Sequence, residues 1–447
     1  MAKIKLNIDG KAVTCENGTT ILQAARSAGI RIPSLCEMQE INHAPGACRM
    51  CVVEVEGVTR LLPSCTTLAT EGMVVRTNSD TITATRKKTL DLMCKHHRMD
   101  CEYCPDYTFC ELHALVRVHG LDDRIYSRVY HERKADESST CIVRDNSKCI
   151  LCRRCVTTCK VQGVSAIGAL NRAENTKIGS VVSIDESVCV GCGQCVKNCP
   201  TGALFVKNDT DLIWKAFNNK REIIFGIMPS VATNIGRFFG EVDSCNNMGK
   251  VAAILKKIGV KEVYDLSGIA LLGAEYAADM LKDSGVVTTC PAVMKYRQDV
   301  KVAKGNDELF NRAAKEQHGH EIFTVYVSPC TAVKSCHDCD VVITTTELYE
   351  LILRACVSRF TAHKVWEETQ PVKVTQLPQI NSEEIDMSLQ DKVKQIFAKT
   401  GNEKTVETVF GCNPTVKDNA ISFVFACPEG CKNGGGQFRT KGFVKKG

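Results

Sequence analysis

Cysteine spacing constrains this chain more than any other feature of its sequence. The 447 residues include 27 cysteines, and most of them fall in C-x-x-C groups. Thiols at this spacing indicate metal binding rather than a disulfide framework, and no apolar signal stretch opens the sequence. We therefore expect a metalloprotein that keeps its thiols reduced in the cytoplasm.

The most specific pattern is a duplicated run of four cysteines with the spacing C-x2-C-x2-C-x3-C. In bacterial two-cluster ferredoxins, the fourth cysteine of each run binds the cluster of the other run. This rule predicts two [4Fe-4S] clusters. One would be held by Cys149, Cys152, Cys155 and Cys199, and the other by Cys189, Cys192, Cys195 and Cys159.

The N-terminal segment predicts a β-grasp ferredoxin. Residues 3–9 alternate polar and apolar, Asp9-Gly10 forms a turn into a second strand, and a helix is expected over residues 19–28. A cysteine loop follows with the spacing C-x11-C-x2-C-x13-C. A [2Fe-2S] cluster is expected there, with zinc as the alternative. The ligands would be Cys36, Cys48, Cys51 and Cys65.

A third pattern places one histidine before three cysteines, after a helix expected over residues 81–92. The ligands would be His97, Cys101, Cys104 and Cys110, with His96 as an alternative to His97. The neighbouring cluster motifs favour a [4Fe-4S] cluster, although the spacing also suits a structural zinc ion. His113 and His119 are expected on a helix surface.

From about Asp209 onward the sequence is typical of an α/β domain. We expect buried strands at residues 223–227 and 286–287, helices at 251–258 and 271–281, and an exposed helix and loop at 383–404. The fold class is thus a multidomain α+β and α/β protein. Its predicted domains are 1–78 (β-grasp), 79–139 (one histidine and three cysteines), 140–207 (two-cluster ferredoxin) and 208–447 (a shortened α/β domain).

Three segments of this last domain, residues 288–291, 328–332 and 426–437, resemble motifs of the iron-only [FeFe]-hydrogenase family. The resemblance implies an H-cluster, made of a [4Fe-4S] cubane and a di-iron subsite with carbonyl and cyanide ligands. Cys431 would bridge the two parts, and Ser230 in the segment 228–230 would contact a cyanide. The matching cubane ligands are Cys290, Cys330, Cys427 and Cys431.

The chain departs from the family pattern at four positions. Thr289 stands where a cysteine usually relays protons, and Val333 stands where a lysine usually grips a cyanide. Lys334 is the adjacent substitute. Ser328 replaces a methionine, and Cys336 replaces a glutamate. The candidate catalytic residues are Thr289, Ser230, Lys334 and Cys431.

Three functions follow from these observations. The first is interconversion of H2 with protons and electrons, with one [2Fe-2S] and three [4Fe-4S] clusters as the relay. The second is a slow H2-sensing hydrogenase, and the third is an electron-transfer subunit whose last domain holds only a [4Fe-4S] cluster. The departures from the family pattern keep the second and third hypotheses open.

The expected partners are ferredoxin or flavin- and NADH-linked subunits, together with maturation proteins, because no dinucleotide fingerprint is present. The net charge of +6 forms no lysine or arginine block, and no apolar run is long enough to span a membrane. We therefore expect neither a nucleic-acid partner nor a membrane span. The loop between Cys336 and Cys339 is either an ordinary surface loop or a metal site shared with Cys412.

The histidine ligand predicts a measurable redox effect. His97→Cys should retain a [4Fe-4S] cluster and lower its midpoint potential, because a fourth thiolate adds negative charge to the site. A redox titration followed by electron paramagnetic resonance measures this shift. Zinc without iron after anaerobic reconstitution would contradict the assignment.

Overall fold

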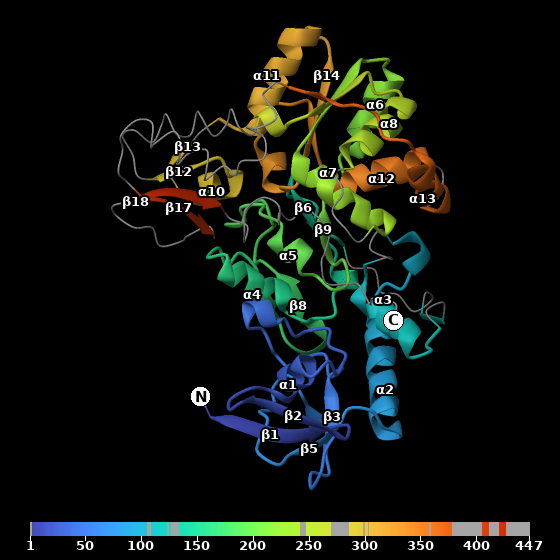
Figure 1. Cartoon of the computed structure of the whole chain (residues 1–447), viewed down its shortest axis with the longest axis vertical. Helices are drawn as coiled ribbons and strands as arrows, with labels where there is room; N and C mark the ends of the chain where they lie inside the picture. Colours follow the sequence, from blue (N-terminus) through green and yellow to red (C-terminus); the bar gives the residue numbers. More distant parts are fainter. Residues whose placement is uncertain are drawn as a thin grey trace.

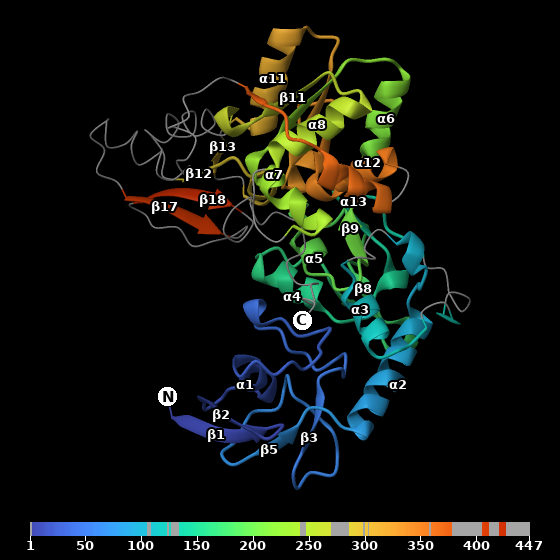
Figure 2. The ribbon, with the colours of Figure 1, turned by 45° about the vertical axis from the view of Figure 1, so that its right-hand side comes forward.

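The computed structural model describes residues 2–104, 109–122, 125–126, 134–241, 247–269, 286–297, 300–302, 304–356, 359–377, 405–410 and 420–425. The chain forms a series of modules along the long axis of the molecule, with the N-terminal sheet at one end and the large α/β module at the other (Figures 1 and 2). Between them lie a helical linking module and the module that contains the two cysteine runs.

The N-terminal module is a five-stranded mixed sheet in the order β2-β1-β5-β3-β4. The predicted strand, strand and helix are present, and Thr20 begins the helix with a capping box to Gln23. Its elements are β1 Lys3–Ile8, β2 Lys11–Glu16, α1 Ile21–Ser27, η1 Gln39–Ile41, β3 Val52–Val55, β4 Leu62–Pro63 and β5 Val74–Arg76.

The linking module contains α2 Asp80–His96, η2 Cys101–Tyr103 and α3 Glu111–Val118. The helix predicted over residues 81–92 is confirmed, and it begins where Ser79 accepts a hydrogen bond from the backbone N–H of Ile82. His113 was expected on the surface and is only 6% exposed, so that prediction is wrong.

The two cysteine runs form similar local structures. Each run leads into a short helix through a left-handed residue, Arg153 before α4 and Gly193 before α5. Strands β6 and β9 pair antiparallel, as do β7 and β8. The elements are β6 Ile142–Arg144, η4 Asn146–Lys148, α4 Arg154–Val161, β7 Gly168–Leu170, η5 Ala173–Asn175, β8 Lys177–Gly179, α5 Gln194–Lys197 and β9 Leu204–Val206.

The C-terminal module has a five-stranded parallel sheet in the order β15-β14-β10-β11-β16. Its central strands carry apolar side chains on both faces, as expected for a parallel sheet covered by helices. The strands are β10 Ile223–Ile227, β11 Glu262–Asp265, β14 Phe323–Ser328, β15 Val341–Thr344 and β16 Thr375–Gln376. The associated helices are α6 Thr210–Asn218, α7 Pro229–Ile235, η6 Gly236–Phe239, α8 Met248–Ile258, α11 Asn306–His318, η7 Ala332–Ser335, α12 Thr345–Ala355 and α13 Arg359–Glu368.

A second parallel sheet, in the order β13-β12-β18-β17, lies beside the first (Figure 1). The strands predicted at 223–227 and 286–287 and the helix predicted at 251–258 are confirmed. The predicted helix at 271–281 and the whole segment 383–404 lie outside the described residues. The elements of this part are β12 Val286–Thr288, α10 Pro291–Tyr296, β13 Lys301–Val302, β17 Thr405–Phe410 and β18 Ala420–Phe425.

Buried polar contacts join the modules. The imidazole of His43, in the first cysteine loop, lies 3.0 Å from the Cys152 carbonyl oxygen and 2.8 Å from the Thr157 hydroxyl. Arg154 donates two hydrogen bonds, of 2.6 and 2.9 Å, to the carboxylate of Glu111. A bidentate pair of this kind fixes direction as well as distance. The linking module and α4 are therefore held in one relative orientation.

A buried ion triad joins the C-terminal module to the chain that enters it. The Lys334 ammonium lies 2.8 Å from Glu347 and 2.5 Å from Asp209, and it also donates to the Val342 carbonyl. Glu347 accepts the backbone N–H of Asp209, and it caps α12 together with Thr344. Burial raises the pKa of Glu347, and Lys334 opposes that rise.

Removing the cation should make stability depend on pH. Lys334→Met leaves Glu347 buried without its counterion, which typically costs about 3–5 kcal/mol. A raised carboxyl pKa stabilises the folded state below that pKa, and the contribution is lost as pH rises through it. The midpoint of thermal unfolding should therefore drop most at pH 8 and recover in part near pH 5. The matched control, Lys334→Met with Glu347→Gln, should lose this pH dependence, and equal behaviour of the two variants would contradict the triad's role.

Candidate metal centres

The four expected ligands of the N-terminal module, Cys36, Cys48, Cys51 and Cys65, lie together and are all buried. The thiol of Cys36 contacts those of Cys48 and Cys65, and Cys51 contacts Cys65. Hydrogen bonds from these neighbours lower the pKa of Cys36, while the same contacts raise the pKa of Cys48 and Cys65. Four buried thiols in contact with one another have the donor chemistry of an iron–sulfur site.

The histidine expected as a ligand is buried and its neighbour is not. His97 is 6% exposed and its Nδ1 has no hydrogen-bond partner among the described residues, whereas His96 is exposed. Burial lowers the pKa of His97 to about 4, so the imidazole is neutral, as a metal ligand must be. Cys110 is also buried, and Cys101 and Cys104 are partly exposed. This arrangement favours His97 over His96 as the ligand.

The two cysteine runs exchange their fourth members in space. Burial raises the pKa of Cys155 well above its usual value, and Cys152, Cys199, Cys195 and Cys149 raise it further. The first run thus has Cys199 of the second run as a neighbour.

The same relation holds for the second run. Burial raises the pKa of Cys195. Cys192 and Cys189 of the same run raise it further, and so does Cys159 of the first run. Each run therefore has the fourth cysteine of the other run among its neighbours, as the spacing predicts, although Cys195 of the second run also lies near Cys155. The ligand sets nevertheless stay predictions, because no group of three or more metal-binding side chains in the described part of the chain is arranged to hold a metal ion.

A cavity of about 450 Å³ opens at the carboxyl ends of β10 and β14 in the C-terminal module. Cys290 and Cys330, which are 4% and 5% exposed, both line it. Their backbone N–H groups donate to the hydroxyls two residues earlier, Thr288 at 3.0 Å and Ser328 at 3.1 Å. The two loops therefore present their cysteines in the same local geometry. Cys427 and Cys431 lie outside the described residues.

The other expected catalytic residues differ in position. Thr289 and Val333 line the cavity, whereas Ser230 is not among the lining residues. Although Lys334 also contributes to the wall, its ammonium is held by Glu347 and Asp209. This geometry opposes the ligand-gripping role expected for Lys334, because moving the ammonium would leave Glu347 buried without a counterion.

The cavity is also lined by Cys336, His337 and Asp338, in the loop that leads to Cys339. Cys336 is exposed, whereas Cys339 is buried and its thiol donates to the Asp307 carbonyl at 3.4 Å. The two sulfurs therefore have different environments, which favours an ordinary loop over a shared metal site. Burial also raises the pKa of Asp307, whose carboxylate accepts the backbone N–H of Asp338.

The second cysteine run lies directly against this cavity. The Thr331 hydroxyl, next to Cys330, donates to the Gly191 carbonyl at 2.6 Å. Cys290 is close enough to raise the pKa of Cys192. Gly191 has φ of +67°, and a Cβ atom there would lie 2.7 Å from the Cys141 sulfur. Only glycine fits at position 191, because any side chain there would collide with Cys141. The backbone of the second cysteine run can therefore contact the loop of Cys330.

Three family models match the chain. They are a 2Fe-2S iron-sulfur cluster binding domain at residues 1–80, a 4Fe-4S dicluster domain at 148–203, and the C-terminal domain of the iron only hydrogenase large subunit at 221–409. The last match ends before the segment 426–437. No helix in the described residues has the length and apolar character needed to cross a membrane.

Curated relatives include a hydrogenase and a hydrogenase subunit. The chain is 32% identical to the NADP-reducing hydrogenase subunit HndD of Solidesulfovibrio fructosivorans, an alignment of 79% of this chain and 69% of the relative. It is 29% identical to iron hydrogenase 1 of Clostridium pasteurianum, over 77% and 67%. It is also 38% identical to the alpha subunit of the NADPH-Fe(3+) oxidoreductase of Geobacter sulfurreducens, over 46% of this chain but 24% of that relative.

The crossed ligand sets predict different effects for two neighbouring cysteines. Cys159→Ser should damage the cluster of the second run, because its thiol lies with Cys189, Cys192 and Cys195. Cys141→Ser is the matched control, since Cys141 is buried beside the same loop but belongs to neither ligand set. Iron analysis and Mössbauer spectra should show a loss only in Cys159→Ser, and equal iron contents would contradict the assignment.

Proposed function

The chain belongs to the iron-only hydrogenase family, and we propose that it interconverts H2 with protons and electrons at an H-cluster reached through N-terminal iron–sulfur clusters. The observation that carries this proposal is the position of Cys290 and Cys330. Both line one cavity, and Cys290 lies beside Cys192 of the second run. A buried redox site needs such a neighbour to exchange electrons with the surface.

The proposed relay follows shared apolar walls. Cys36 and Cys48 of the first site pack in one buried cluster with Cys110 of the histidine site and Cys152 of the first run. Cys192, Cys290 and Cys330 share another buried cluster. Electrons would therefore pass from the [2Fe-2S] module through three [4Fe-4S] clusters to the cavity. Burial of these thiols favours clusters over free thiolates, because an isolated buried charge is unstable.

The cavity residues fit the cubane part of an H-cluster. Cys290, Cys330, Cys427 and Cys431 would hold the cubane, and the di-iron subsite of an H-cluster would supply the iron chemistry that binds and splits H2. Thr288 and Ser328 orient the first two cysteine loops through their hydrogen bonds. Thr289 would pass protons at the cavity wall through its hydroxyl, which is a much weaker acid than a thiol. Slow turnover is expected for this reason.

A second candidate function is electron transfer through a [4Fe-4S] cluster without a di-iron subsite. The observation that favours it is the loss of the cyanide-gripping cation, since Val333 is apolar and the Lys334 ammonium belongs to a buried triad. A slow H2-sensing hydrogenase is a variant of the first function and rests on the same Thr289 substitution.

We propose that the external partners are ferredoxin or NAD(P)H-linked subunits. The names of two relatives refer to NADP reduction and to an NADPH-linked oxidoreductase. Those activities belong to the relatives. We propose similar partners for this chain because it shares their cluster modules. Maturation proteins would be needed to insert a di-iron subsite.

Infrared spectra of the matured protein separate the two functions. Carbonyl and cyanide bands are expected if the di-iron subsite is present. Thr289→Cys should then raise H2 turnover at constant iron content by part of the range of about 10²–10⁴-fold that a positioned acid or base contributes. Thr289→Val, which removes the hydroxyl, is the matched control and should lower turnover. If both variants and the wild type lack these bands, the electron-transfer function is correct.

A further inference from the structure

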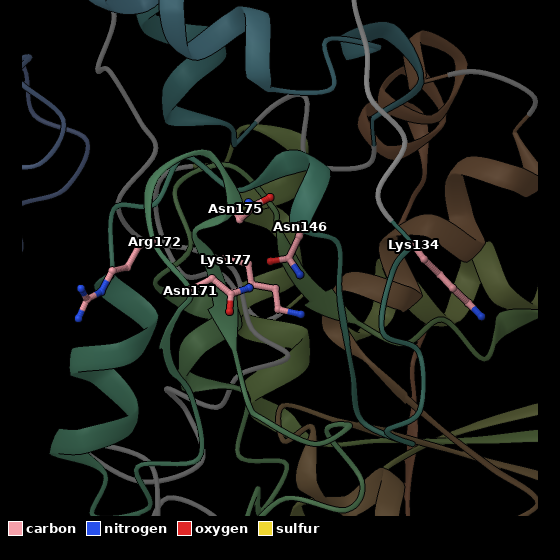
Figure 3. Close-up of a pocket in the computed structure, with 6 residues that line it drawn as sticks. All are labelled: Lys134, Asn146, Asn171, Arg172, Asn175 and Lys177. Atoms are coloured by element: carbon pink, nitrogen blue, oxygen red, sulfur yellow. The ribbon is translucent and has the colours of Figure 1, made fainter.

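The module with the two cysteine runs has a second cavity, of about 690 Å³, that is separate from the one at Cys290. In Figure 3 its asparagine side chains and Lys177 gather near the centre, while Arg172 and Lys134 lie on opposite sides. Most of the wall comes from the β7–β8 hairpin and η5. The lining residues are Lys134, Asn146, Asn171, Arg172, Asn175 and Lys177.

Among the described residues that line this cavity, three carry a positive charge and none carries a carboxylate. Lys134, Arg172 and Lys177 are exposed, and none of them has an ion-pair partner among the described residues. The Asn146 Oδ1 atom is shielded from solvent and also has no hydrogen-bond partner in the described part of the chain. Unneutralised cations beside a hollow attract an anionic surface and raise its local concentration.

The cavity wall is connected directly to a cysteine ligand of the proposed relay. Asn146 begins η4, and its carbonyl accepts the backbone N–H of Cys149 at 3.3 Å. Cys149 belongs to the expected cubane set with Cys152, Cys155 and Cys199. A molecule seated on the cavity would therefore lie within one short turn of that cubane.

We propose that this basic cavity docks an acidic electron-carrier protein, which exchanges electrons directly with the cubane of Cys149, Cys152, Cys155 and Cys199. This inference rests on the proposed cluster relay. The reduced carrier loses one electron, the oxidised cubane gains it, and no bond forms or breaks. Because Arg172 and Lys134 lie on opposite sides of the cavity, the site suits a broad acidic surface better than a single small anion (Figure 3). Electrons could then enter the relay either at the cavity or at the [2Fe-2S] module, so the [2Fe-2S] module is not required for entry.

The test is a charge reversal in the reconstituted full-length chain. Lys134→Glu, Arg172→Glu and Lys177→Glu are combined, and a reduced acidic 2[4Fe-4S] ferredoxin is mixed with the oxidised protein in a stopped-flow experiment. The rate of cluster bleaching should fall about 10-fold or more at low salt, because electrostatic steering raises association rates by 10–10³. The difference should shrink at about 0.5 M salt, where screening is strong.

The matched control reverses three exposed lysines of the C-terminal module, Lys257, Lys364 and Lys373, and changes the net charge equally. Its ferredoxin rate should stay within about twofold of the wild type, since the charges lie outside the cavity. Reduction by methyl viologen, a small cationic carrier, should not slow in either variant. Iron content and absorbance spectra of both variants verify that the clusters are intact.

Two results would overturn the proposal. Equal slowing of both variants would mean that net charge, and not the cavity, controls association. ATP binding to the wild type but not to the cavity variant, with an unchanged ferredoxin rate, would identify a small-anion site instead.

Cluster bleaching requires no H2 chemistry. A chain that lacks hydrogenase activity but shows the charge-dependent rate would therefore contradict the hydrogenase proposal and support this one.

Discussion

The packing of the cysteine modules depends on the burial of cysteine sulfur. A thiolate removed from water needs a positive partner, and the raised pKa values of Cys155 and Cys195 show how strongly their sites disfavour an unpartnered negative charge. Iron supplies that partner within a cluster, so metal binding and packing of the cysteine modules are one process. The protein contributes short turns that bring sulfurs together without bulky side chains. The left-handed residues before α4 and α5 are examples.

The modules are joined to one another by buried contacts. Their interfaces contain the same residues that form the candidate metal centres, and each interface is closed by a buried polar contact. His43 extends from the first cysteine loop to the Cys152 carbonyl, and Thr331 donates to Gly191 beside the last centre. The contacts that hold the modules in place also fix the distances between neighbouring centres. Structural order and electron flow therefore depend on the same bonds.

Local spacing was sufficient to predict much of the architecture. The neighbours of both cysteine runs, the strand at β10 and the helix at α8 all follow from short-range pattern. The role of Lys334 did not, because its two carboxylate partners are distant in sequence and meet it only after the sheet has formed. The burial of His113 was missed for a related reason. A single histidine in a short helix gives no sign of which face other modules will cover.

The basic cavity was also invisible in the sequence. Its cations are spread over residues 134–177 with charges of both signs between them, so they form no block, and only the β7–β8 hairpin and η4 bring them around one hollow. Charge that is sparse along a chain can thus become concentrated in space. The net charge of +6 says nothing about where positive charge gathers, whereas the folded hairpin places three cations at one cavity.

The ion triad of Lys334 also bears on how such a chain can change over generations. Glu347 caps α12, pairs with Lys334 and accepts the backbone of Asp209, so three structural tasks meet at one carboxylate. Moving the lysine from position 334 to 333 would leave Glu347 without its counterion. Adding a lysine at 333 while keeping Lys334 would place a second cation near the first. A lysine at position 333 could therefore replace Lys334 without loss of stability only if Glu347 or Asp209 changed as well.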